Sequence, residues 1–160
     1  MNKIKAAFFD RDGTLIEDVN YLSDLKQIKI LPGIVKHCLS LQKRDYKLFV
    51  VTNQSGIARG FFDEDFVKKT HEYLKKDFEK QGVFFESFCY CPHHPEAKIE
   101  KYLLNCNCRK PKPGMFLKLA NEFNIDLKKS LMFGDKLLDV QAGQAAGCES
   151  FYIQDALAKI

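Results

Sequence analysis

The sequence predicts an α/β fold in which a parallel sheet has helices on both of its faces. Short runs of β-branched and aromatic residues alternate with segments whose apolar residues recur at helical spacing. Polar motifs directly follow several of these runs, as they do at the ligand-binding edge of open α/β sheets. The length of 160 residues suits one domain with its own core, which we expect to span 1–160.

The first part of the chain is predicted to form a β-α-β unit. Residues 5–9 and 47–52 are the two strands, since both are short, apolar and rich in β-branched or aromatic residues. Between them Pro32-Gly33 opens a helix. Its apolar positions follow helical spacing at Ile34, Val35, Cys38, Leu39 and Leu41. A helix and a strand thus take up most of the chain between Thr14 and Thr52, which leaves no room for a separate cap domain.

The remaining chain continues the alternation. Asp63 is the candidate N-cap of a second helix, which Gly82 is expected to end. Strands are then predicted at 83–90, 130–133 and 150–153, and helices at 114–123 and 137–146, the last ended by Gly147. The chain stops soon after the last predicted strand, which leaves the completeness of the sheet open.

Composition and charge exclude several classes of protein. The net charge is +4, with 25 basic and 21 acidic residues interspersed along the chain, so no basic stripe suggests a nucleic-acid partner. No apolar run is long enough for a membrane helix, and the N-terminus lacks a secretory signal. We therefore expect a cytoplasmic monomer that binds a small anionic substrate and neither nucleic acid nor a membrane.

Two carboxylates stand at the end of the first predicted strand, in Asp10-Arg11-Asp12-Gly13-Thr14. Phosphate esters repel nucleophiles, so a catalyst needs a cation, an in-line nucleophile and an acid for the leaving oxygen. Asp10 is the candidate nucleophile that would form an aspartyl-phosphate, and Asp12 is the candidate acid and base. An Asx-type turn at the strand end is the alternative interpretation, which the further motifs disfavour.

Three further motifs supply the other requirements of phosphoryl transfer. Thr52-Asn53 ends the second strand, where the Thr52 hydroxyl and backbone amides could hold phosphoryl oxygens. Arg109-Lys110 supplies cations. Asp135, in Gly134-Asp135-Lys136, is the third carboxylate for a Mg²⁺ ion at Asp10, Asp12 and Asp135. Asp139 is either a solvated helical carboxylate or a residue that orients the metal site.

Four of the six cysteines lie in one short region. Without a secretory signal, such cysteines indicate metal or core roles rather than disulfides. Three thiols and an imidazole can close a tetrahedral, structural Zn²⁺ site that pins the loop at about 91–108. The predicted ligands are Cys91, His93, Cys106 and Cys108, with His94 as the rival to His93 and a cluster without metal as the alternative. Cys38 and Cys148 are expected in the core. Core packing is also favoured for Cys89, although a metal role stays open.

The ordered motifs resemble those of the haloacid dehalogenase superfamily of phosphatases. They are Asp10-x-Asp12-Gly13-Thr14, Thr52-Asn53, Lys110 and Gly134-Asp135, and they span nearly the whole chain. The resemblance implies a Rossmann-like core and the catalytic roles given above. It also implies that the backbone carbonyl at Asp12 is a Mg²⁺ ligand.

Within the superfamily the longer motifs resemble the heptose-1,7-bisphosphate 7-phosphatases. The motifs are 52–60, 91–95 and 108–115. The resemblance implies Mg²⁺-dependent removal of the 7-phosphate in nucleotide-heptose and surface glycan synthesis. Histidinol-phosphate phosphatases share the zinc cluster and are the alternative; a zinc-stapled binding module without catalysis is the alternative from another class.

A sugar bisphosphate carries a second anionic group, which guanidinium groups could hold. The predicted substrate-binding residues are Asp18, Asn20, Tyr21, Thr52, Asn53, Gln54, Ser55, Arg59, Arg109, Lys110 and Lys136. For Asp18, Asn20 and Tyr21 a polar surface loop is the alternative, and for Arg59 a surface charge.

Overall fold

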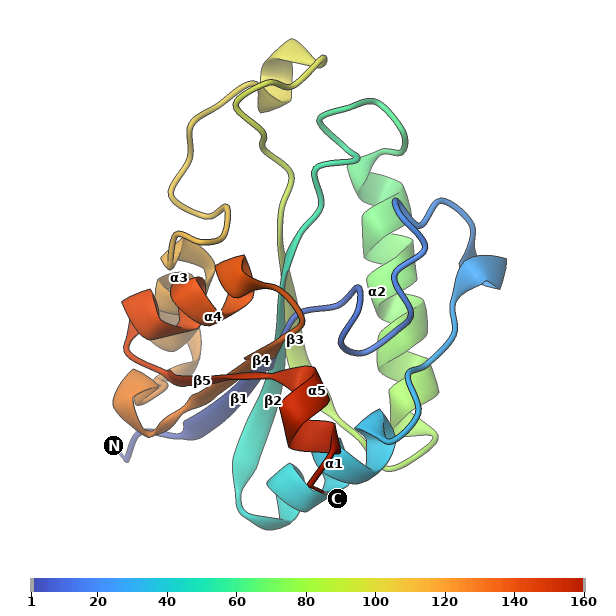
Figure 1. Ribbon diagram of the computed structural model, residues 1–160. Coiled ribbons are helices and arrows are strands. Elements are labelled where there is room, and N and C mark those ends of the chain that lie inside the picture. Colours follow the sequence, from blue (N-terminus) through green and yellow to red (C-terminus); the bar gives the residue numbers. More distant parts are fainter. Residues whose placement is uncertain (1, 160) are drawn as a thin grey trace.

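A single parallel sheet of five strands organises the protein, in the order β3-β2-β1-β4-β5 (Figure 1). The computed structural model describes residues 2–159, so both ends of the predicted domain, Met1 and Ile160, lie outside the described residues. The strands are β1 Lys5–Phe9, β2 Tyr46–Asn53, β3 Phe85–Cys91, β4 Leu131–Gly134 and β5 Glu149–Tyr152. All five predicted strands are confirmed, with ends that differ by at most two residues.

Helices cover both faces of the sheet, as predicted. They are α1 Ile34–Lys43, α2 Glu64–Glu79, α3 Gly114–Phe123, α4 Leu137–Ala146 and α5 Ile153–Leu157. One core contains Ile34, Leu74 and Ile153, so α1, α2 and α5 pack on one face of the sheet. The opposite core contains Phe116 and Ala142, which places α3 and α4 on the other face (Figure 1).

Two predictions of helix ends are confirmed and one is wrong. The Asp63 side chain accepts a hydrogen bond of 2.8 Å from the Phe66 amide and caps α2. Gly147 ends α4 with φ 99°. Helix α2, however, ends at Glu79, and Gly82 lies in the following turn with φ 82°. A glycine signals a left-handed residue, but it does not say how many turn residues separate that position from the helix.

The last predicted strand is one residue too long at its C-terminal end. Strand β5 ends at Tyr152, and Ile153 begins the short helix α5, in which its side chain is buried. A β-branched residue directly after an apolar strand resembles its continuation. Five residues are also too few to show helical periodicity, so only the packing of Ile153 into the core identifies α5.

The sheet topology brings the polar motifs to one edge. Strand β1 lies between β2 and β4, with Phe9 in register with Val50 on one side and Phe133 on the other. The residues that follow these strands therefore meet at the carboxyl edge, where the strand order reverses. The loops after β2 and β3 rise above this edge at the top of Figure 1.

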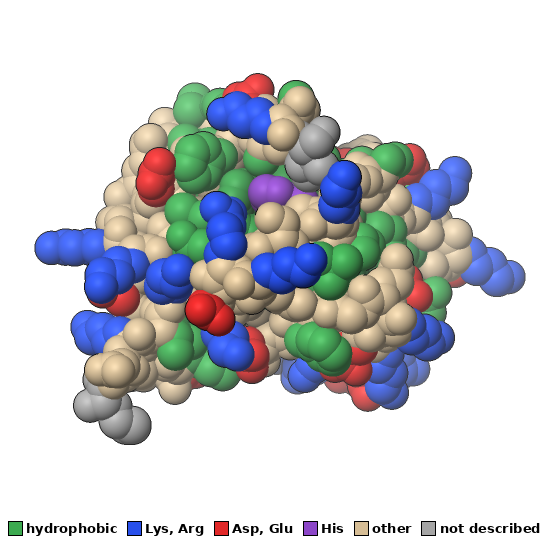
Figure 2. Space-filling view, turned by 90° about the horizontal axis from the view of Figure 1, so that it is seen from below, with side chains coloured by type: hydrophobic (Ala, Val, Ile, Leu, Met, Phe, Trp, Pro, Cys, Tyr) green, Lys and Arg blue, Asp and Glu red, His purple; other side chains and the backbone are tan. Residues whose placement is uncertain are grey.

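The opposite end of the molecule carries a mixed surface. Figure 2 shows this face, where Lys and Arg side chains are interspersed with hydrophobic and acidic ones. Among residues 2–159, every helix is too short or too polar to cross a membrane.

Candidate active site

Lys110 is a buried cation at the carboxyl edge. Its ammonium donates hydrogen bonds of 2.8 Å to Asp10 Oδ1, 2.7 Å to Asp139 Oδ1 and 2.9 Å to the Val51 carbonyl. Burial disfavours the charge, but the carboxylates of Asp10 and Asp139 outweigh burial and raise the pKa of Lys110. Lys110 therefore stays positively charged and offsets the acidic groups around it.

Three carboxylates converge beside Lys110. Each of Asp10, Asp135 and Asp139 offers an oxygen within 4.8 Å of the others. Asp135 Oδ1 is buried and has no hydrogen-bond partner among residues 2–159. An unpartnered buried carboxylate oxygen is costly, and a hard divalent cation would satisfy it. The residues thus fit a Mg²⁺-type site.

Two glycines permit this close approach of carboxylates. A Cβ atom at Gly13, which has φ 83°, would collide with the Asp135 carboxylate. A Cβ atom at Gly134 would collide with the Asp139 side chain. The glycines of both motifs are therefore required by the packing of the acidic groups.

The solvated alternative for Asp139 is wrong. Its side chain is fully buried, and its Oδ2 accepts hydrogen bonds from the amides of Asp135 and Lys136 at 3.2 and 3.1 Å. These bonds fix the start of α4, while Oδ1 binds Lys110. Asp139 therefore orients the carboxylate cluster and belongs to it.

The Asp12 carboxylate is engaged away from this cluster. It accepts hydrogen bonds from Arg11 at 3.2 and 3.1 Å and from the Gln54 amide at 3.2 Å. Its carboxylate is thus separate from the three that could hold a cation, but it lines the same cavity as Asp10. This arrangement is compatible with an acid and base beside a nucleophile.

Side chains at the end of β2 form hydrogen bonds with the Lys110 backbone and within the site. The Asn53 side chain accepts a hydrogen bond of 3.0 Å from the Lys110 amide and donates one of 3.2 Å to the Lys110 carbonyl. Thr52 Oγ1 accepts a hydrogen bond of 2.9 Å from the Gln54 side-chain amide. Asn53 therefore fixes the backbone of Lys110, a role that the spacing of the motifs does not reveal.

A cavity of about 250 Å³ opens over the carboxyl edge. All the residues predicted to bind substrate line it, together with Asp10, Asp12 and Asp139. The loop at 18–21 and Arg59 therefore lie at this cavity, beside the carboxylates. Asp135 is not among the lining residues, but one of its carboxylate oxygens lies within 4.8 Å of oxygens of Asp10 and Asp139.

Two loops meet across the mouth of this cavity. Asn20 and Tyr21 have φ 56° and 65°, a conformation that is strained for a tyrosine. The Tyr21 ring packs against Phe61 at 4.9 Å, and the Arg59 guanidinium lies 5.8 Å from its centre. The loop after β1 and the loop after β2 thereby hold each other over the site.

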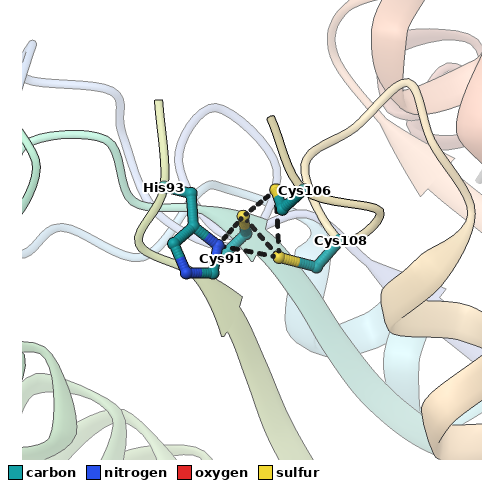
Figure 3. Close-up of side chains that lie close together, drawn as sticks. All are labelled: Cys91, His93, Cys106 and Cys108. Carbon is teal, nitrogen blue, oxygen red and sulfur yellow. Dashed lines mark hydrogen bonds between the residues drawn. The ribbon is translucent and has the colours of Figure 1, made fainter. Parts of the chain in front are cut away.

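The predicted zinc ligands come together in one cluster (Figure 3). The Cys91 thiol lies 3.5 Å from Cys106 and 2.7 Å from Cys108. His93 Nδ1 lies 3.4 Å from the Cys108 sulfur. In a tetrahedral zinc site with bonds of about 2.3 Å, sulfur atoms lie about 3.8 Å apart. The Cys106 sulfur lies 3.5 Å from that of Cys91 and 3.4 Å from that of Cys108, near this spacing, whereas the Cys91–Cys108 distance is shorter than the spacing around a bound ion. Three thiols and an imidazole in one cluster are a donor set that fits a closed Zn²⁺ site.

His94 and the remaining cysteines lie outside this cluster. The His94 Nδ1 atom accepts a hydrogen bond of 3.0 Å from the Glu96 amide. Cys38 and Cys148 are buried in the two cores, as predicted. Cys89 packs against the same core as Cys91 but is not among the four clustered residues.

The segment between His93 and Cys106 has local structure. It contains a short 3-10 helix, Glu100–Tyr102, which the sequence patterns do not predict. The Glu64 carboxylate accepts hydrogen bonds from Tyr90 at 2.6 Å and from Tyr102 at 2.7 Å. These bonds lower the pKa of Glu64 and tie the segment to the start of α2.

Replacement of Lys110 by methionine tests its electrostatic role. Lys110→Met leaves Asp10 and Asp139 adjacent without their cation, so we expect a loss of about 3–5 kcal/mol in the free energy of unfolding. The measurement is urea unfolding without added metal. The exposed Lys118→Met is the matched control, with an expected change below about 0.5 kcal/mol. Equal stability of Lys110→Met and wild type would contradict the pairing.

The pKa of Asp135 leads us to expect that cation binding depends on pH. Burial, with the charges of Asp10 and Asp139, raises the pKa of Asp135 to about 7. Because the unfolded pKa is lower, this group's contribution to metal-free stability is complete at low pH and is lost as the pH rises toward 7. A cation needs the ionised form, so added Mg²⁺ should raise the melting temperature more at about pH 8 than at about pH 6. Asp135→Asn should abolish this difference; an equal Mg²⁺ effect at both pH values would contradict it.

Residues 18–147 match the family of haloacid dehalogenase-like hydrolases. With the parallel sheet and the carboxylate site at its carboxyl edge, the match shows that the chain belongs to this family.

Individual relatives are more specific. The chain is 43% identical over 143 residues to the D-glycero-β-D-manno-heptose-1,7-bisphosphate 7-phosphatase of Photorhabdus laumondii, covering 89% of this chain and 76% of the relative. It is 45% identical over 142 residues to the enzyme of the same name from Pasteurella multocida, and the match covers 89% of this chain and 77% of that relative. A crystal structure of D,D-heptose 1,7-bisphosphate phosphatase from B. bronchiseptica, complexed with magnesium and phosphate, superposes with a TM-score of 0.82 at 30% identity. It covers 98% of this chain and 87% of that one.

Proposed function

We propose that the protein is a Mg²⁺-dependent phosphatase that removes the 7-phosphate of D-glycero-β-D-manno-heptose 1,7-bisphosphate. The observation that carries the proposal is the convergence of Asp10, Lys110 and the Asp135–Asp139 pair at one sheet edge. The relatives named for this reaction support the substrate and its β anomer. Residues 1–160 would act as one phosphatase domain.

The proposed reaction has two steps, in which Asp10 and Asp12 act in turn. In the first, an Asp10 oxygen attacks phosphorus and the bond to the sugar oxygen breaks, while Asp12 gives that oxygen a proton. In the second, Asp12 takes a proton from a water molecule that attacks phosphorus, and phosphate leaves as Asp10 is regenerated. Lys110 remains charged throughout and holds Asp10 in place.

Mg²⁺ would be held by Asp10 and Asp135 with the backbone carbonyl of Asp12, and Asp139 would orient this group. When bound, the cation neutralises charge on the phosphoryl oxygens. The Thr52 hydroxyl and the loop after β2 are proposed to bind those oxygens.

The positions of two arginines support a bisphosphate rather than a simple phosphomonoester. Arg59 and Arg109 line the cavity together with Lys136, and buried nitrogens of both arginines have no hydrogen-bond partner among the described residues. Guanidinium groups bind phosphate with two parallel hydrogen bonds. We propose that they hold the 1-phosphate, while Asp18, Asn20 and Tyr21 contact the sugar.

A comparison of substrates tests the proposal. With Mg²⁺, phosphate release should be fastest from the β-heptose 1,7-bisphosphate, at least about tenfold faster in kcat/KM than from the α anomer or histidinol phosphate. Faster hydrolysis of histidinol phosphate would assign the protein to histidine synthesis instead. No hydrolysis of any phosphomonoester, with intact metal content, would favour the binding module.

The product is a sugar monophosphate suited to nucleotide-heptose and surface glycan synthesis. We propose a cytoplasmic monomer, consistent with six cysteines that form no disulfide among the described residues, as is usual in a reducing compartment. Sedimentation at micromolar concentration tests the oligomeric state, and a dimer would contradict it.

A further inference from the structure

Two buried polar residues beside the site are not explained by the reaction as proposed. Arg11 is 1% exposed and His71, on α2, is 6% exposed. Neither residue lines the cavity that holds the candidate substrate-binding groups. Direct contact with substrate therefore does not account for a buried guanidinium at this position. Burying such a group is costly unless its donors are paired.

The Arg11 guanidinium forms a bidentate hydrogen bond with the Asp12 carboxylate. Its Nε donates a hydrogen bond of 3.2 Å to Asp12 Oδ1, and its Nη2 donates one of 3.1 Å to Oδ2. Two parallel bonds fix the plane of a carboxylate as well as its distance. Gln54 adds a third bond, of 3.2 Å, to Oδ2.

His71 fixes the remaining side of the guanidinium. Arg11 Nη1 lies 3.2 Å from His71 Nε2. Arginine can only donate, so Nε2 must accept, which requires a neutral imidazole. Burial, with the charge of Arg11, lowers the pKa of His71 well below its usual value and keeps the ring neutral. The imidazole stacks on Phe88 of β3, with ring centres 5.0 Å apart.

We propose that Arg11 and His71 are positioning residues that hold the Asp12 carboxylate in the orientation needed for proton transfer to the leaving oxygen. The chain of contacts runs from β3 through His71 and Arg11 to Asp12. The guanidinium also stabilises the carboxylate that Asp12 becomes after it has given up its proton. This inference rests on the proposed role of Asp12 as acid and base.

The choice of leaving group provides a specific test. A sugar alkoxide is a poor leaving group and needs a proton, whereas 4-nitrophenolate leaves without one. We would measure the first step in single turnovers with excess enzyme and Mg²⁺, using the heptose bisphosphate and 4-nitrophenyl phosphate. His71→Phe keeps the ring and its stacking but removes the acceptor nitrogen.

We expect His71→Phe to slow sugar release by roughly tenfold or more and nitrophenolate release by less than about threefold. His71→Gln places an amide oxygen near the former Nε2 and should restore sugar release. Arg11→Lys keeps the charge without the fork and should show the same imbalance, so the test stands even if His71→Phe does not fold. Leu74→Ala, which opens a cavity elsewhere on α2, should lower stability and leave the ratio of the two rates unchanged.

Asp12→Asn separates this inference from the proposed function. It should produce the largest imbalance between the two substrates. If Asp12→Asn shows the imbalance while folded His71→Phe and Arg11→Lys do not, the positioning role is wrong and the reaction stands. If Asp12→Asn slows both substrates equally, the acid role is wrong, and this inference is overturned with it.

Discussion

Asp10→Asn is expected to reduce turnover by about 10⁴-fold or more while the protein remains folded. An amide cannot form the acyl phosphate, so the first step loses its nucleophile. The fold should persist because asparagine has the same shape and Lys110 keeps its bonds to Asp139 and the Val51 carbonyl. The measurements are phosphate release with Mg²⁺ and the thermal unfolding midpoint.

The matched control is the same carboxylate-to-amide change at the rim of the cavity. Asp18→Asn removes a charge whose Oδ2 lies 3.9 Å from the Lys136 ammonium, at a partly exposed ion pair. We expect it to raise KM and to retain most of kcat. If Asp10→Asn kept more than about 1% of wild-type kcat, the covalent mechanism would be wrong.

Disruption of the candidate zinc site, Cys91, His93, Cys106 and Cys108, is expected to have the largest effect on stability. The four-ligand cluster joins the end of β3 to the segment that precedes Arg109 and Lys110. Binding energy in such sites is folding energy, about 10–16 kcal/mol in small zinc peptides. Cys108→Ser should therefore lower zinc content below about half an equivalent and the unfolding midpoint by about 10 °C or more, since 1 kcal/mol corresponds to about 2–4 °C.

Activity should fall together with zinc, because Lys110 lies two residues after Cys108. Cys89→Ser is the matched control: Cys89 lies on the same strand and packs against the same core, outside the four-residue cluster. It should retain a full equivalent of zinc by elemental analysis. A Cys108→Ser protein with full zinc content and the wild-type midpoint would contradict the structural site.

Periodicity and local motifs were sufficient to predict the elements of the sheet, and they selected residues that the fold brings together at one cavity. Strand β1 and helices α3 and α4 have the predicted bounds, because each has a clear apolar pattern and a distinct end. The residues chosen to bind substrate all line one cavity because they follow neighbouring parallel strands or adjoining loops. The short elements Glu100–Tyr102 and Ile153–Leu157 escaped prediction because they are less than two turns long.

The site residues that were missed or left open act through contacts distant in sequence. His71 is sixty positions from Arg11, and its hydrogen bond exists only because α2 packs beside the end of β1. The spacing of Asp139 allowed a solvated carboxylate, and its burial against Lys110 decided otherwise. Asn53 was predicted at the site, but its hydrogen bond to the backbone of Lys110, fifty-seven positions away, is likewise visible only in the fold.

Local sequence patterns were enough to predict the alternation of strands and helices, the family motifs and the chemical types of the candidate metal ligands. These follow from local spacing, which depends on the periods of helix and strand and on the ligand preferences of each metal. Only the tertiary structure shows which carboxylates lie close enough to share a cation, which nitrogen of His71 accepts a bond and which cysteine lies outside the four-residue cluster. Those outcomes depend on distances between separate elements, and packing of the whole sheet sets them.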